Sequence, residues 1–352
     1  MQPAWITRAC VCLMAFVFGV SSSLAQDVDK NETSAGYVPV IAGGGAYVFN
    51  VNGSVPTLEP QINPALLVPF GRHLLLESRV DFTGFFQRDQ QTSGPYTGKI
   101  FKSVDFAQLD WLANTHAIVI GGKYLLPFGL YNERLVPVWI RNLQDSPITA
   151  AIGTRTSGAG DGAMLRGVAV QTSKTTTQYS AYFSARSGIN QLGAARTAGG
   201  DISLFSPDAR LEIGTSWQRF LQQHQINASA TYVSWQPPGT SLDVKAEYDY
   251  CYNGRGYWIE GAYLFDGATP AFLRKVQAIG RMQEFYPLHG GGNSLPGIRT
   301  KRPDFGLNYY LRDNLRLISS YARSFSSQRN ANVWNLGVTY RFTIPLWFGG
   351  KK

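Results

Sequence analysis

Residues 241–252, SLDVKAEYDYCY, alternate between two kinds of side chain. One set of positions, beginning at Leu242 and ending at Tyr252, is apolar or aromatic. The set between them is mostly charged and comprises Asp243, Lys245, Glu247, Asp249 and Cys251. Successive side chains of a β-strand point to opposite faces, so this segment predicts a strand with one apolar and one charged face. Residues 333–342, VWNLGVTYRF, repeat the pattern and place Trp334 and Leu336 opposite Asn335 and Arg341.

Segments of about 10 residues with this alternation follow one another after the N-terminus, and no helical period persists. A soluble sandwich or barrel would turn the apolar faces inward, whereas a membrane barrel turns them toward lipid. Full charges on the polar faces, aromatic residues near the segment ends and an alternation of short with long connections favour the membrane barrel. The sequence therefore predicts an all-β fold, a transmembrane antiparallel β-barrel in the bacterial outer membrane.

The connections allow the strands to be counted. Tight turns are expected at Pro69–Arg72, Ala113–His116, Ser173–Thr175, Pro207–Ala209, Gln236–Thr240, Gly267–Pro270 and Arg312–Asn314. Outer connections are expected at Val51–Pro56, Asp89–Lys99, Pro127–Asp161, Gly188–Ala198, Leu221–His224, Asn253–Gly256, Phe285–Lys301 and Ser327–Asn332. Together they join about 16 strands, an even number with both termini in the periplasm. Strands at Tyr37–Asn50 and Gly199–Ser206 have the weakest patterns, and without them the count is 14.

The N-terminus reads as a signal peptide, residues 1–25. An apolar run from Ala9 to Val20 follows Arg8, and Ser23-Leu24-Ala25 provides small residues for cleavage. We expect a short periplasmic segment at 26–36, the barrel at 37–348 and a tail at 349–352. The mature chain then holds one cysteine, Cys251, and no internal disulfide framework.

Composition narrows the function. The chain has 352 residues, 44% hydrophobic and 16% charged, which excludes general disorder. Removing Arg8 with the signal peptide lowers the net charge from +9 to +8. A basic balance suits nucleic acid, an acidic surface or an anionic solute, and export makes nucleic acid the weakest of these.

The longest connection, Pro127–Asp161, is the third outer loop, and loops of this length are usually functional or disordered. Trp139, Leu143 and Ile148 make it too apolar for a free tail. We expect the loop to fold into the lumen and narrow the pore; packing over the barrel rim is the alternative. Its basic residues, candidates for the constriction and the anion path, are Arg134, Arg141 and Arg155. Pairing with Glu133 and Asp145 would instead give them a structural role.

Gly122–Leu135, followed by Pro137 and Trp139, resembles the segment entering the third loop of phosphate-selective porins of the O and P type. The hairpin Gly306–Leu317 is similar to the penultimate hairpin of that family. The resemblance implies a homotrimeric sixteen-stranded channel with an inward third loop and a lumen lined by arginine and lysine. The matching motifs are structural and identify no individual binding residue.

Gly337-x-x-Tyr340-x-Phe342 resembles the terminal-strand signal read by barrel-insertion machinery, although a signal nearer Phe348 is the alternative.

The alternation of the strands predicts, without reference to any family, which basic residues of the barrel wall face the lumen. With the apolar face outward, the inward cations are Arg79, Lys123, Arg186, Lys245, Arg281, Arg316 and Arg341. Guanidinium groups match carboxylate and phosphate oxygens, and rings of them select anions. The alternative is that they only neutralise inward carboxylates, namely Glu77, Asp81, Glu247 and Asp249.

No spacing in the chain matches a catalytic triad or a metal-ligand motif, so we expect no enzyme, no cofactor and no metal site. The expectation is a passive outer-membrane porin for small anions, weakly anion-selective and surrounded by lipid. A non-conducting barrel acting as an enzyme, adhesin or scaffold is the alternative.

Overall fold

The computed structural model describes residues 38–53, 55–88, 96–152, 158–187, 196–222, 227–289, 295–328 and 330–346. It contains 16 strands: β1 Val40–Asn52, β2 Val55–Phe70, β3 Leu74–Arg88, β4 Tyr96–Asn114, β5 Ala117–Leu125, β6 Ala159–Gln171, β7 Thr176–Ser187, β8 Thr197–Ser206, β9 Leu211–Phe220, β10 Asn227–Trp235, β11 Leu242–Cys251, β12 Gly254–Leu264, β13 Val276–Pro287, β14 Thr300–Arg312, β15 Leu315–Ser326 and β16 Ala331–Pro345. The described part has two helical turns, η1 (Tyr131–Leu135) and η2 (Leu273–Lys275). Neither has the length or apolar content to span a membrane.

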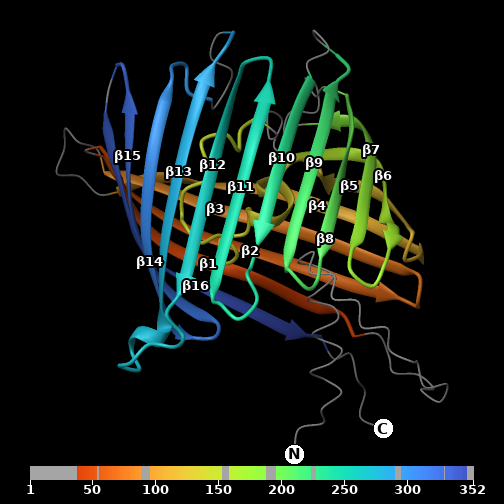
Figure 1. The fold of residues 1–352 in the computed structure, drawn as a ribbon, viewed down its shortest axis with the longest axis horizontal. Coiled ribbons are helices and arrows are strands. Elements are labelled where there is room, and N and C mark those ends of the chain that lie inside the picture. Colours follow the sequence, from red (N-terminus) through yellow and green to blue (C-terminus); the bar gives the residue numbers. More distant parts are fainter. Residues whose placement is uncertain are drawn as a thin grey trace, which may run out of the picture. The chain divides into compact units, whose positions relative to one another are not determined.

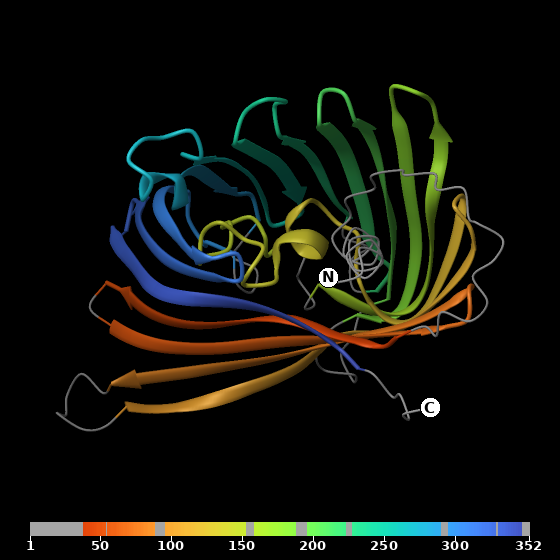
Figure 2. The same cartoon turned by 90° about the horizontal axis from the view of Figure 1, so that it is seen from below.

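Every strand pairs antiparallel with the next, and β1 closes the barrel by pairing with β16 from Val40↔Pro345 to Asn52↔Val333. Figure 1 shows the strands side by side and Figure 2 looks along the ring that they form. The expected count of 16 is confirmed, including β1 and β8, the two strands with the weakest sequence patterns. Closure leaves no free sheet edge, as a lipid environment requires.

Alternation assigns the two faces of the wall as expected. Tyr248 and Tyr250 of β11 are 47% and 44% exposed on the outside, whereas Glu247 and Asp249 are buried on the inside. In β16 the outward Leu336 is 62% exposed and the inward Asn335 is buried. The exterior is therefore apolar and the interior polar, which is the arrangement of a transmembrane barrel.

Several connections differ in length from expectation. The first outer connection is shorter than expected, because β1 and β2 stay paired up to Asn52↔Val55. The outer connection expected at Asn253–Gly256 is also shorter, because β12 begins at Gly254. At the opposite end, the turn expected at Gly267–Pro270 extends over 265–275 and includes η2. The expected signal peptide, the 26–36 segment, Phe348 and the 349–352 tail lie outside the described residues.

Leu336 provides a test of the outward face. It lies in the middle part of β16 and is exposed to the surroundings of the barrel. We expect Leu336→Arg to destabilise the folded barrel by about 2–4 kcal/mol, the cost of an arginine facing lipid near the bilayer midplane. Denaturant unfolding in phospholipid vesicles measures this loss. Leu336→Ala is the control, and an arginine variant as stable as the alanine variant would contradict the lipid-facing assignment.

Candidate functional site: the third loop inside the barrel

The connection between β5 and β6, called L3 below, is described for residues 126–152 and 158. Figure 2 shows its yellow trace inside the ring of strands. The two ends are tied together by Asn132, whose Nδ2 donates to the carbonyls of Leu126 (2.7 Å) and Gly158 (2.8 Å). Gly158 has φ +72°, and a Cβ there would meet the Asn132 amide, so this closure requires glycine. The expected inward fold of the third loop is confirmed.

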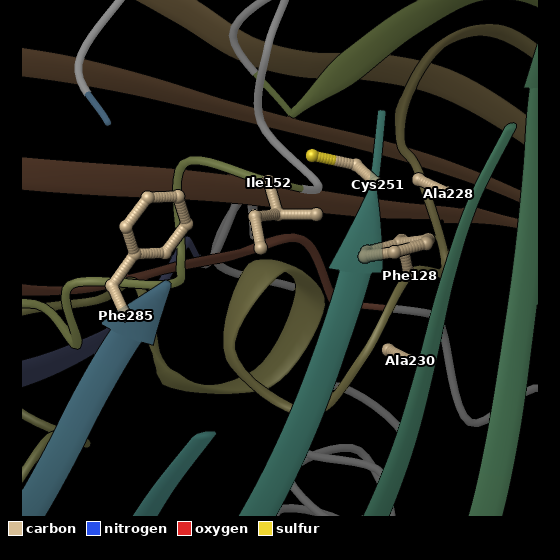
Figure 3. Close-up of a cluster of buried hydrophobic side chains, with 6 residues drawn as sticks. All are labelled: Phe128, Ile152, Ala228, Ala230, Cys251 and Phe285. Atoms are coloured by element: carbon tan, nitrogen blue, oxygen red, sulfur yellow. The ribbon is translucent and has the colours of Figure 1, made fainter. Parts of the chain in front are cut away.

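Apolar side chains hold L3 against the inner wall of the barrel. Figure 3 shows Phe128 and Ile152 of L3 clustered with wall residues, namely Ala228, Ala230, Cys251 and Phe285. A second cluster joins Tyr131 and Leu135 to the inward rings of Tyr232 and Trp258. These inward apolar positions exist because L3 shields them from the water of the lumen.

Polar wall groups hold the L3 backbone. Ser216 accepts from Gly129 N–H at 2.8 Å, and Gln283 accepts from Ile148 N–H at 2.7 Å. From the other direction, Arg281 donates to the Asp145 carbonyl at 2.8 Å. These bonds satisfy backbone groups of an irregular segment that would otherwise be stranded in the interior. L3 is therefore fixed to the wall formed by β9–β16.

Arg316 makes the densest of these attachments. Its Nη2 donates to the carbonyls of Val138, Trp139 and Arg141, at 3.4, 3.1 and 3.0 Å. Its guanidinium also lies 5.1 Å from the ring centre of Trp139. The residue is 3% exposed. Arg316 thus faces the lumen as expected, but its Nη2 is occupied by L3 and its Nε donates to Thr339 of β16 at 3.2 Å.

Most other lumen cations are paired with carboxylates. The pairs are Arg79–Asp105 (2.8 Å), Arg134–Glu212 (2.6 Å), Arg166–Glu133 (2.9 Å), Arg281–Glu260 (3.7 Å), Lys245–Asp243 and Arg302 with Asp145 and Asp304. These pairs agree with the alternative that the wall cations neutralise inward carboxylates. The carboxylates that they pair with are not those expected from the sequence. In particular, Glu133 and Asp145 pair with Arg166 and Arg302 and not with Arg134 or Arg141.

The two described loop candidates have different surroundings. Arg134 pairs with Glu212 and lies 5.6 Å from the ring centre of Tyr232, so it is part of the attachment of L3 to the wall. Arg141 donates to Gln61 at 3.1 Å and forms no ion pair within the described residues. Arg155 lies outside the part of the chain that the structure describes.

Arg141 lines a cavity between L3 and the β2–β4 wall. Its volume is about 200 Å³, and its lining comprises Gln61, Asn63, Arg79, Asp81, Thr83, Asp105, Val136, Pro137 and Arg141. Seven of these nine side chains are polar or charged, whereas L3 meets the opposite wall through apolar clusters. The cavity is the place where a polar solute can lie between the loop and the wall.

Lys123 lies on the opposite face of the wall from the one expected. Cross-strand partners share a face, and Lys123 pairs with Ala107 and Asp161, whereas its neighbour Tyr124 packs inward on Leu126 of L3. Lys123 therefore points outward. The inner face of β5 is apolar because L3 covers it, so the rule that apolar residues face lipid fails there.

Two further wall candidates complete the set. Arg341 lies 5.5 Å from the Trp139 ring centre, which places it in the lumen beside L3. Arg186 of β7 lies opposite Asp161 of β6 in the strand register. Its side chain lies outside the described structure.

Two inward arginines, Arg166 and Arg302, are absent from the candidates predicted by strand phase, and they pair with L3 carboxylates. The signal was present: Arg302 is two residues from the inward Asp304, and Arg166 two from the inward Met164.

No known family model matches the chain, and no curated protein matches it. Solved structures with a similar fold include Salmonella typhi OmpF in complex with daunomycin, with TM-score 0.57 and 11% identity over 86% of this chain and 97% of that one. Pseudomonas putida OprB at low pH has TM-score 0.56 and 9% identity over 87% and 92%. A Rhodopseudomonas blastica porin has TM-score 0.53 and 9% identity over 86% and 100%.

At these identities the likeness establishes the fold, a porin-type barrel, and it does not single out the phosphate-selective O and P type. A sixteen-stranded barrel with an apolar exterior is an architecture of the bacterial outer membrane, and the predicted location of the chain is confirmed.

Proposed function

We propose that this chain is a passive diffusion channel for small polar solutes. The observation that supports the proposal is the polar cavity between L3 and β2–β4. L3 packs on β5–β7 through Leu126 and against β10–β13 through its other apolar clusters, and it leaves this cavity beside β2–β4. A barrel of 16 strands is wide enough for a channel, and an inward loop narrows it without closing it.

We further propose that the ion preference of the channel is weak. Arg141, Arg316 and Arg341 form no ion pair within the described residues, and they support the anion preference expected from the sequence. The arginines that pair with carboxylates add little to the anion preference. The inward carboxylates Glu77 and Asp110 favour cations and so weaken it. Phosphate as a preferred solute stays a prediction from resemblance.

Planar bilayer recordings in a KCl gradient test this function. We expect stable open currents and a reversal potential equivalent to a chloride-to-potassium permeability ratio within about a factor of three of unity, as for a lumen of nearly balanced charge. An absence of conductance from correctly folded protein would overturn the channel and favour a non-conducting barrel.

Arg141 and Arg134 are expected to differ in the same recordings. Arg141→Gln removes an unpaired cation from the cavity and should shift the permeability ratio toward potassium. Arg134→Gln breaks the Glu212 pair and should lower the free energy of unfolding by about 1–3 kcal/mol with an unchanged ratio. The reverse pattern would assign solute contact to Arg134 and loop architecture to Arg141.

A homotrimer, surrounding outer-membrane lipid and recognition by barrel-insertion machinery belong to the same proposal. The closure of β16 on β1 and the apolar exterior support the last two. Trimer formation rests on the resemblance, and sedimentation of the folded protein in detergent measures it.

A further inference from the structure

The cavity between L3 and strands β2–β4 has charges of both signs on its walls. Arg79 and Arg141 contribute two positive charges, and Asp81 and Asp105 contribute two negative charges. Its volume of about 200 Å³ is far above the roughly 10–15 Å³ that one water molecule needs. The space therefore suits a small solute.

Both arginines keep an unused donor. Arg79 donates from Nε to Asp105 at 2.8 Å, but its buried Nη2 has no partner in the described protein. Arg141 donates from Nη2 to Gln61, and its buried Nε is likewise unsatisfied in the described part. An unsatisfied buried donor of a charged group is costly, and both side chains line the cavity, so a ligand or water that reaches these atoms from the cavity would remove that cost.

The cavity also offers acceptors. Asp81 accepts from Asn63 Nδ2 with one oxygen and from Thr83 Oγ1 at 2.9 Å with the other. Asp105 accepts from Arg79 and from Ser103. An ionised carboxylate has about four acceptor positions, so each aspartate keeps capacity for a further donor. Asn63, which is 9% exposed, has an unpartnered buried Oδ1 as well.

The balance of charge decides the class of ligand. A simple anion would bind the two arginines but would be repelled by the two carboxylates. A simple cation would bind the two carboxylates but would be repelled by the two arginines. We propose that the cavity binds small zwitterions of the α-amino acid type, with the carboxylate held by Arg79 and Arg141 and the ammonium group facing Asp81 and Asp105. This inference rests on the proposed channel function and names the solute class of that channel.

Alanine is the probe, with propionate and ethylamine as analogues that each lack one charged group. The protein is reconstituted in a planar bilayer in constant KCl, and each compound is added while the single-channel current is recorded. We expect alanine to reduce the current reversibly, with a half-effective concentration at least about tenfold below that of either analogue. A charge-assisted hydrogen bond contributes about 1.5–3 kcal/mol, or roughly 10–100-fold in affinity.

Arg141→Gln and Asp105→Asn should each raise the half-effective concentration of alanine by about tenfold or more. Arg323→Gln is the matched control, because Arg323 is exposed and adjacent to the inward Ala322 of β15, so it points outward. Its alanine response should equal that of the unmodified protein. Retained KCl current verifies that each variant is folded.

Equal block by alanine and propionate would overturn the zwitterion site in favour of an anion site. KCl current without any alanine effect would overturn the site and leave the channel intact. A folded protein with no KCl current would overturn the channel, and calorimetric titration with alanine then decides the binding site separately, an absence of heat overturning it.

Discussion

Arg316→Gln is expected to cause the largest loss of stability of any lumen substitution considered for this barrel. The side chain is almost fully buried and donates to three L3 carbonyls while contacting the Trp139 ring. Glutamine is shorter and uncharged, so it leaves carbonyls without donors and removes the cation–π contact. The expected loss is on the order of 3 kcal/mol in the free energy of unfolding.

The same variant should alter the current. With L3 released near Trp139, the loop samples several positions and the open-channel current becomes noisy, while the strand ladder stays intact. Thermal unfolding followed by circular dichroism measures the stability, and bilayer recording measures the noise. Arg323→Gln, which removes the same charge from the outside of β15, should change neither. Unchanged stability and quiet currents in Arg316→Gln would show that Arg316 does not hold the loop.

The barrel was predictable from the sequence because its determinants are local. The alternation in residues 241–252 and 333–342 depends only on the strand period and on the contrast between lipid and lumen. Loop lengths then set the parity of the connections. The inward position of L3 followed from its apolar content, since Trp139 and Leu143 could be buried only against the wall.

The pairing of charges was not predictable, because it depends on contacts between residues far apart in the chain. Arg134 meets Glu212 across 78 positions, and Arg302 meets Asp145 across 157. Lys123 was assigned to the wrong face for a related reason. Ile120 and Tyr124 are inward and apolar because Leu126 of L3 packs on them. The periodicity of a strand cannot predict that contact.

The second large effect concerns the route of the current. Thr83 lines the cavity from β3, on the side of the lumen that L3 leaves open. In a Cys251→Ala background, Thr83→Cys places a single thiol there. Reaction with a sulfonatoethyl thiosulfonate adds a bulky anion in the passage, and a constriction of this size is sensitive to added volume and charge.

We propose that solutes cross the barrel between L3 and β2–β4, and the single-channel current of Thr83→Cys before and after complete labelling measures this. Arg323→Cys is the control, because Arg323 is exposed, points outward and lies near the outer end of β15. We expect labelling at Thr83→Cys to lower the current by at least about half and labelling at Arg323→Cys to leave it unchanged. Complete modification of Thr83→Cys, verified by mass, with an undiminished current would show that solutes take another route.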